Sequence, residues 1–196
     1  MELKRLFQIH SNTRHPKAGN LLLSEPTMND LHFGRSAVLL IEHNDSEGSF
    51  GIIMNKALNV RLNEVVDTFH DFEAPVYLGG PVADNQIFFM HTLGDLLPDA
   101  FEFMDGLYWG GDTEALNALI ATGIATPDNV RFFIGYAGWS AGQLVQELER
   151  NAWGVCKTDA KTLLDTPVDQ LWSRYVDRLG KEYEIWKRFP KNPEDN

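Results

Sequence analysis

Residues 135–144 constrain the fold of this chain more than any other segment, because they join an apolar run to an amphipathic run through three glycines. Tyr136 and Trp139 stand between these glycines. Apolar run, glycine-rich turn and amphipathic run, in that order, predict a strand over residues 130–136 and a helix over residues 141–150. We therefore expect a tight strand-to-helix corner at residues 137–142.

The rest of the chain shows strand and helix patterns without the regular alternation of a βαβ fold. Short runs rich in branched and aromatic residues predict strands at 20–24, 36–42, 49–55, 75–78 and 86–91. Helical spacing predicts helices at 1–10, about 60–70, 113–122 and from about 168 to Gly180, and residues 93–112 read as loops. Glycines at strand ends are typical of bends and bulges. The pattern predicts an α+β fold whose mixed or antiparallel sheet curls toward a barrel.

Length and composition predict a single domain over residues 1–196. The hydrophobic content of 43% is that of a globular protein with a core. No apolar run approaches the roughly 20 residues that span a membrane, and the N-terminus lacks the apolar stretch of a secretory signal. The single cysteine, Cys156, excludes an intrachain disulfide framework. We therefore expect a cytoplasmic protein with no membrane association.

The net charge of −11 arises in the middle of the chain, where residues 60–130 carry 12 acidic side chains and one basic side chain, Arg61. Such a surface repels phosphate backbones and anionic lipids. No helix-turn-helix signature stands out, and the basic residues near the C-terminus are interleaved with Glu182 and Glu184, so direct nucleic-acid binding is not expected. The acidic face either keeps the protein soluble or docks a basic protein partner.

Residues 138–142 match the G-x-S-x-G pattern of a nucleophile elbow, with Ser140 at its centre. In the hydrolase fold that uses this elbow, the catalytic histidine follows the serine in the sequence. All six histidines of this chain precede Ser140: His10, His15, His32, His43, His70 and His91. The alternative interpretation is that the glycines let a helix pack closely on a strand, without chemistry.

The same corner is the best candidate for an anion or a polar ligand, because a helix N-terminus with exposed N–H groups is expected there. Gln143 and Glu147 follow Trp139 at helical spacing and either line a pocket or satisfy local hydrogen bonds. Gly79 and Gly80 precede a proline and do not form a phosphate loop. The histidines lack metal-ligand spacing. We expect no metal and no cofactor.

Four motifs in order resemble the YqgE/AlgH family. They are residues 19–26 with Phe33, residues 38–43 with 47–55, residues 79–82, and residues 135–144 with Glu147 and residues 151–153. The resemblance runs from about residue 19 to residue 155 and is specific only in combination. The family pattern has Gly-Trp-Gly where this chain has Gly138-Trp139-Ser140, which argues against Ser140 as a family nucleophile.

The resemblance implies a bifurcated sheet that forms a pseudo-barrel with flanking helices, in a bacterial, cytoplasmic protein. The expected core spans about residues 19–165, with an N-terminal leader over 1–18 and a C-terminal helix and tail over 166–196. Members of the family are largely uncharacterised, one branch is labelled a transcriptional regulator, and no agreed catalytic residues can be carried over.

Two hypotheses follow. The first is a non-enzymatic binding or regulatory module, which takes a protein partner or a small polar ligand and regulates transcription indirectly if at all. Its candidate surface comprises His43, Asn55, Gly79, Gly80, Tyr136, Gly138, Trp139, Ser140 and Gln143. The second is a hydrolase or a nucleotide-acting enzyme that uses the 138–142 turn, with Ser140, Glu42, His43, Asn55 or His91. The sequence favours the first, because it pairs no nucleophile with a base.

Overall fold

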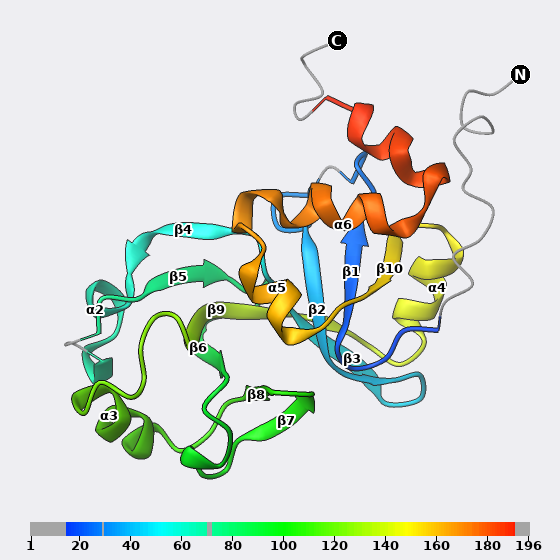
Figure 1. The fold of residues 1–196 in the computed structure, drawn as a ribbon. Coiled ribbons are helices and arrows are strands. Elements are labelled where there is room, and N and C mark those ends of the chain that lie inside the picture. Colours follow the sequence, from blue (N-terminus) through cyan, green and yellow to red (C-terminus); the bar gives the residue numbers. More distant parts are fainter. Residues whose placement is uncertain (1–14, 29, 70–71, 191–196) are drawn as a thin grey trace, which may run out of the picture.

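Strand β9 (Val130–Trp139) belongs to both branches of a single sheet (Figure 1). Its first half pairs in parallel with β5 (Pro75–Leu78) and antiparallel with β6 (Val82–His91). Its second half pairs antiparallel with β3 (Gly48–Ile53). The sheet therefore divides along β9.

The computed structural model describes residues 15–28, 30–69 and 72–190. The helix expected at 1–10 lies outside these residues. Within them, ten strands form one sheet and helices cover its faces, which confirms the mixed, bent and bifurcated α+β class. The terminal strands of the path, β10 (Trp153–Lys157) and β7 (Phe101–Met104), do not pair with each other within the described part of the chain. The sheet is therefore not closed into a barrel.

The first branch is the antiparallel row β10-β1-β2-β3, in which β1 spans Asn20–Ser24 and β2 spans Ala37–Asn44. Helix α4 (Gln143–Glu149) packs on one of its faces. Helices α5 (Ala160–Asp165) and α6 (Leu171–Leu179) pack on the other.

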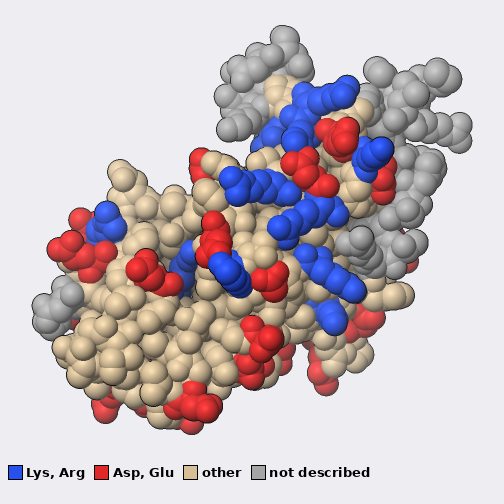
Figure 2. Space-filling view, viewed as in Figure 1, with Lys and Arg blue, Asp and Glu red and all other residues tan. Residues whose placement is uncertain are grey.

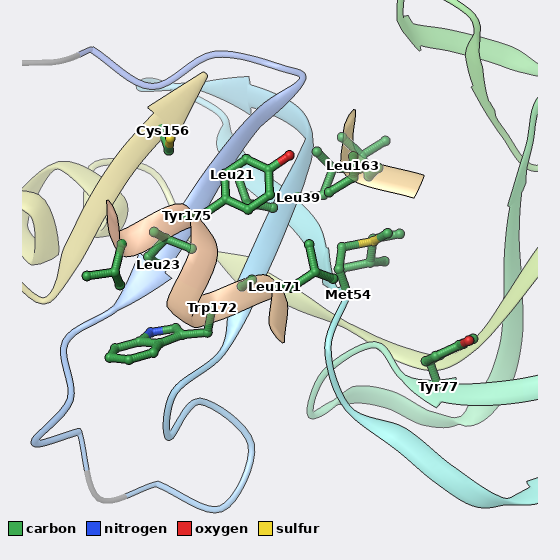
Figure 3. Close-up of a cluster of buried hydrophobic side chains, with 14 of the residues drawn as sticks. Leu21, Leu23, Leu39, Met54, Tyr77, Cys156, Leu163, Leu171, Trp172 and Tyr175 are labelled. Carbon is green, nitrogen blue, oxygen red and sulfur yellow. The ribbon is translucent and has the colours of Figure 1, made fainter. Parts of the chain in front are cut away.

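Burial of both faces explains why β1 and β2 are continuous apolar runs. Successive side chains of a strand point to opposite faces. Leu21 and Leu39 accordingly join the cluster under α6, which Figure 3 shows, whereas Leu22 and Val38 join the cluster under α4. A helix on each face therefore leaves no solvated side to this part of the sheet.

The second branch surrounds the first half of β9. It contains β4 (Ala57–Arg61), β5, β6, β8 (Leu107–Trp109) and β7. Its own core lies under α2 (Leu62–Val65), η1 (Asp67–Phe69), η2 (Gly94–Leu96) and α3 (Thr113–Ala121). Phe132 of β9 is fully buried there among Phe69, Phe72 and Phe89.

Several elements differ from the sequence prediction. The continuous helix expected at 60–70 is wrong, because Val66 is extended with φ −141° and α2 ends after one turn. The loop expected at 93–112 contains the β7–β8 hairpin, whose strands are too short for a periodic signal. Strand β9 continues through Trp139, so the corner begins three residues later than expected.

The C-terminal helix ends before Gly180 as expected and lies on the core of the first branch (Figures 1 and 3). The indole N–H of Trp172 donates to the main-chain oxygen of Ser24 at 2.9 Å. The guanidinium of Arg35 lies over the Trp172 ring and donates to the carbonyl of Phe189. The 3₁₀ segments η3 (Val168–Gln170) and η4 (Lys181–Arg188) flank α6. These contacts tie the end of the chain to β1.

Charge is unevenly spread over the surface. In Figure 2, Lys and Arg gather over α6 and η4, while acidic side chains dominate the charged positions of the second branch. This matches the excess of acidic residues between 60 and 130. Among the helices of the described residues, none has the length and apolar character required to span a bilayer.

Candidate functional site

An open cleft of about 710 Å³ lies where β9 passes from one branch of the sheet to the other. Strands β2, β3, β6, β8 and β9 all contribute to it. The residues that line it are Glu42, His43, Asn44, Glu47, Gly48, Ser49, Phe50, Val82, Phe88, Trp109, Tyr136, Gly138 and Trp139. Its position follows from the bifurcation, because the strands on either side of β9 diverge there.

Four half-buried aromatic side chains pack into one wall of this cleft. Phe88 and Trp109 are nearly parallel, with ring centroids 5.7 Å apart and an interplanar angle of 15°. Tyr136 meets Phe88 edge-on at 5.6 Å and Phe50 edge-on at 5.8 Å. Offset and edge-to-face contacts are the favourable geometries of aromatic pairs. We call this group of Phe50, Phe88, Trp109 and Tyr136 the aromatic wall.

Register and a bulge place these rings on one face. Val82 of β6 is paired with Tyr136, and Phe50 of β3 is paired with Gly138. Gly135 has φ +67°, a conformation that suits glycine and interrupts the alternation of β9. Gly138 carries no side chain, and a Cβ there would lie 3.4 Å from the Tyr136 ring and 3.5 Å from Val82. The cleft therefore keeps open space beside Tyr136.

The charged lining of the cleft is acidic. Glu42 is exposed and stands opposite Phe50 in the β2–β3 register. Glu47 accepts a hydrogen bond from the Asn44 side-chain amide at 2.7 Å. The lining contains no lysine and no arginine. The site therefore carries negative charge beside apolar rings.

His43 makes a polar chain with two neighbours. Its Nδ1 lies 2.7 Å from the Ser49 hydroxyl, and its Nε2 lies 3.2 Å from an Asp45 carboxylate oxygen. This is the order of groups in a serine nucleophile relay. In the β2–β3 pairing, His43 lies opposite Ser49, and the adjacent pair is Glu42 opposite Phe50. Because adjacent side chains of a strand point to opposite faces, His43 and Ser49 point to the other face of the hairpin from Glu42 and Phe50. The relay-like chain therefore faces away from the aromatic wall, and Asp45 is largely exposed.

Trp139 lies on that opposite face, in the cluster under α4. Its indole N–H donates to Glu147 at 2.8 Å, and the indole of Trp153 donates to the same carboxylate oxygen at 2.7 Å. Gln143 donates to the other oxygen at 3.0 Å. Of the two interpretations of the Gln143–Glu147 row, the geometry matches local hydrogen bonding. Glu147 holds the corner to α4.

The corner at 140–142 does not expose the N–H groups that the sequence led us to expect. The N–H of Ser140 donates to the Gln143 side chain at 3.0 Å, and the N–H of Gly142 donates to the Asp45 carbonyl at 2.9 Å. The Ser140 hydroxyl also donates to Gln143, at 3.2 Å. These groups are satisfied within the protein, so the corner is not preformed to receive an anion.

Asn55, Gly79 and Gly80 lie outside the cleft and have architectural contacts. The Asn55 side chain accepts from the N–H of Ala37 at 2.8 Å and donates to the Arg35 carbonyl at 2.9 Å. A Cβ at Gly79 would lie 2.1 Å from the carbonyl oxygen of Gly135. Glycine is required there because the two backbones cross in direct contact.

His91 lies in the second branch and is buried. Its Nδ1 accepts from the N–H of Leu93 at 3.2 Å, so Nε2 carries the proton and donates to the Gly110 carbonyl at 3.0 Å. Burial lowers the pKa of His91. Across the residues that the structure describes, no group of three histidine, cysteine, aspartate or glutamate side chains is arranged to hold a metal ion.

Of the sequence candidates, the cleft collects His43, Tyr136, Gly138 and Trp139, and it does not include Ser140 or Gln143. Sequence reasoning missed three rings of the aromatic wall: Phe50, which it quoted only as part of a family motif, Phe88 and Trp109. Phe88 lies between Ile87 and Phe89, which pack in the core of the second branch. The alternation of side chains along a strand therefore places Phe88 on the opposite face of β6. Trp109 lies in the segment 93–112, whose sequence has neither strand nor helix periodicity, so no pattern indicated its role.

Comparison with known proteins decides the family. The sequence profile described as AlgH-like matches residues 21–184. The chain belongs to the AlgH-like family. A UPF0301 protein of Parabacteroides distasonis is 41% identical over 192 residues, which cover 97% of this chain and 96% of that protein. A UPF0301 protein of Bacteroides thetaiotaomicron is also 41% identical over 192 residues, with 97% of each chain covered.

Two solved structures share the fold. The solution structure of the AlgH protein from Pseudomonas aeruginosa is 28% identical, with a TM-score of 0.68, and covers 93% of this chain and 100% of that chain. A crystal structure from Corynebacterium diphtheriae has a TM-score of 0.73 at 22% identity, covers 96% of this chain and 100% of that chain, and bears on the fold alone. The family resemblance drawn from the motifs is confirmed.

Proposed function

We propose that the chain is a binding module and that the cleft beside β9 is its ligand site. The observation that carries this proposal is the aromatic wall, in which four half-buried rings face an open space of about 710 Å³. Pockets for small organic ligands enclose about 300–1,000 Å³ and are lined by aromatic side chains with a few polar groups. The four rings are only half-buried, so part of their apolar surface is left to the cleft.

The strands that hold the wall support this interpretation. Phe50, Phe88 and Tyr136 come from β3, β6 and β9, and β9 pairs along its backbone with both of the other strands. Binding sites on paired strands are held more precisely than sites on loops. The wall is therefore rigid before a ligand arrives, which lowers the entropic cost of binding.

We further propose that any regulatory role in the bacterial cytosol proceeds through this ligand or through a protein partner, and not through direct contact with DNA. The net charge of −11 and the acidic lining of the cleft both oppose a phosphate backbone. The hydrolase alternative has less support. The hydroxyl of Ser140 is hydrogen-bonded to Gln143, and His43 contacts the hydroxyl of Ser49 instead of that of Ser140.

A fragment screen on ¹⁵N-labelled protein tests the proposal. The five tryptophans give separate indole N–H signals, of which that of Trp109 reports on the cleft while those of Trp139, Trp153, Trp172 and Trp186 report on other regions. We expect ligands that shift the Trp109 signal and lose affinity in Gly138→Val, which fills the cleft beside Tyr136. Binding that leaves the Trp109 signal in place, or that Gly138→Val leaves unchanged, contradicts the proposal.

The hydrolase alternative is tested on the same protein with chromogenic short-chain esters. We expect no turnover above that of buffer. Turnover that Ser140→Ala or Ser49→Ala abolishes would replace the binding module with an enzyme.

A further inference from the structure

We propose that the ligand of the cleft is a small organic cation, an alkylated ammonium or a similar group that carries apolar surface around its charge. This inference rests on the proposed ligand site and specifies its chemistry. It combines two independent features of the lining: the half-buried rings of the aromatic wall, and carboxylates with no lysine or arginine among the described residues of the lining.

The aromatic wall offers electron-rich faces. Phe88 and Trp109 stack with an interplanar angle of 15°, while Phe50 and Tyr136 stand at 74° to each other. The four rings therefore do not lie in one plane, and their half-buried surfaces border the cleft from different angles. Cations are attracted to the faces of aromatic rings, most strongly to tryptophan, and quaternary ammonium groups are recognised in this way.

The carboxylates supply the opposite charge at the edge of the same wall. Glu42 is exposed opposite Phe50, and Glu47 is oriented by its hydrogen bond with Asn44. Among the described residues the lining offers no lysine or arginine to a bound anion, whose charge Glu42 and Glu47 would repel. A neutral apolar ligand would gain nothing from Glu42 or Glu47 and would leave their charge beside an apolar surface.

An inorganic cation fits this lining less well than an organic one. Hard divalent cations take six or more oxygen ligands, and the cleft offers two carboxylates that come from different segments. A hydrated metal ion would also leave the ring faces without a partner. A cation with methyl or methylene groups satisfies both features, since its apolar surface covers the rings while its charge stays near Glu42.

The test compares three probes of similar size on the ¹⁵N-labelled protein. Choline is the cation, 3,3-dimethylbutan-1-ol is its neutral isostere with carbon in place of nitrogen, and 3,3-dimethylbutanoate is an anion. We expect choline to shift the Trp109 indole signal in a saturable way, with the signals of Trp172 and Trp186 unchanged. We expect the alcohol to bind at least ~5-fold more weakly, and the anion not to bind.

Three variants locate the effect. Glu42→Gln removes the charge and keeps the side-chain size, and we expect it to weaken choline binding about 3- to 10-fold. Glu149→Gln makes the same change at an exposed position of α4 outside the cleft, and we expect no effect. Trp109→Leu is expected to abolish binding, followed on the main-chain N–H signals of Tyr136 and Gly138. Raising the salt concentration should weaken choline binding in the wild type more than in Glu42→Gln.

The outcomes separate this inference from the proposed function. Equal or tighter binding of the alcohol or the anion at Trp109 overturns the cationic ligand and leaves the cleft as a ligand site. Choline binding that Glu42→Gln and Glu149→Gln weaken equally also overturns it. If none of the three probes shifts the Trp109 signal at concentrations up to the millimolar range, the inference fails, and the proposed site then depends on the fragment screen alone.

Discussion

Trp139 and Trp153 donate their indole N–H groups to the same carboxylate oxygen of Glu147, at 2.8 and 2.7 Å. Their rings meet edge-to-face, with centroids 5.8 Å apart. One residue of α4 thus joins the end of β9 to the start of β10. The strand-to-helix corner after β9 is held by the Glu147 carboxylate and not by Ser140.

The first prediction concerns stability at this corner. Glu147→Ala removes the carboxylate that accepts from the indole N–H groups of two buried tryptophans. An unsatisfied buried donor costs about 1–3 kcal/mol. We expect a loss of about 2–4 kcal/mol in the free energy of unfolding, measured by urea denaturation. Glu149→Ala, an exposed change on the same helix, should lose less than about 0.5 kcal/mol. Equal losses in both variants would contradict this role.

The second prediction separates architectural glycines from a glycine of the cleft. A Cβ at Gly79 would lie 2.1 Å from a backbone oxygen, whereas a Cβ at Gly138 would lie 3.4 Å from the edge of the Tyr136 ring. Neither glycine has a positive φ, so the comparison isolates the clash. We expect Gly79→Ala to destabilise by more than about 3 kcal/mol and Gly138→Ala by less than about 1 kcal/mol. Thermal melts of the two variants measure the difference, and similar melting temperatures would refute it.

The same two glycines show what the sequence could predict. Gly79 follows a predicted strand, and glycines at strand ends indicated a bend or bulge. In the structure the backbone at Gly79 passes in direct contact with the backbone at Gly135. The sequence predicted well the elements whose pattern is local. Examples are the strands at Pro75–Leu78 and Ala37–Asn44 and the helix at Thr113–Ala121. Each of these elements carries its periodicity within its own residues.

The aromatic wall could not be predicted, because it depends on pairing between distant strands. Trp109 belongs to a strand of three residues, and only its pairing with β6 brings it beside Phe88. Likewise, Asn55 was grouped with Tyr136 on motif alone, yet its side chain links two backbone segments of the first branch. Strand register decides such neighbours, and a single sequence does not specify it.

The third prediction concerns the attachment of the C-terminal helix. Trp172→Phe keeps most of the buried ring and removes the hydrogen bond to the Ser24 carbonyl. We expect a loss of about 1–2 kcal/mol in the free energy of unfolding. We also expect faster hydrogen exchange in α6 and η4, because the bond ties α6 to β1. Arg174→Ala, at an exposed position of the same helix, is the control. Exchange that is unchanged in Trp172→Phe would show that the bond does not hold the helix.

The fourth prediction concerns pH and rests on His91, which is 1% exposed. Burial lowers the pKa of His91 in the folded protein below its ordinary value of 6.5, and the hydrogen bond to Gly110 opposes this only in part. The unfolded chain therefore binds a proton more readily than the folded one between the lowered pKa and about pH 6.5. The contribution of neutral His91 to stability is complete above about pH 6.5 and is lost as the pH falls toward the lowered pKa.

The measurement is the free energy of unfolding in urea, taken between pH 5 and pH 8 for the wild type and for His91→Gln. Other histidines titrate in the same range, so the difference between the two proteins isolates His91. Glutamine does not titrate, although it loses part of the hydrogen bonding and lowers stability at every pH. We expect the stability advantage of the wild type to be constant above about pH 7 and to shrink as the pH falls below 6.5. An advantage that grows on acidification would mean that the folded protein stabilises protonated His91, and the tautomer inferred from Leu93 and Gly110 would then be wrong.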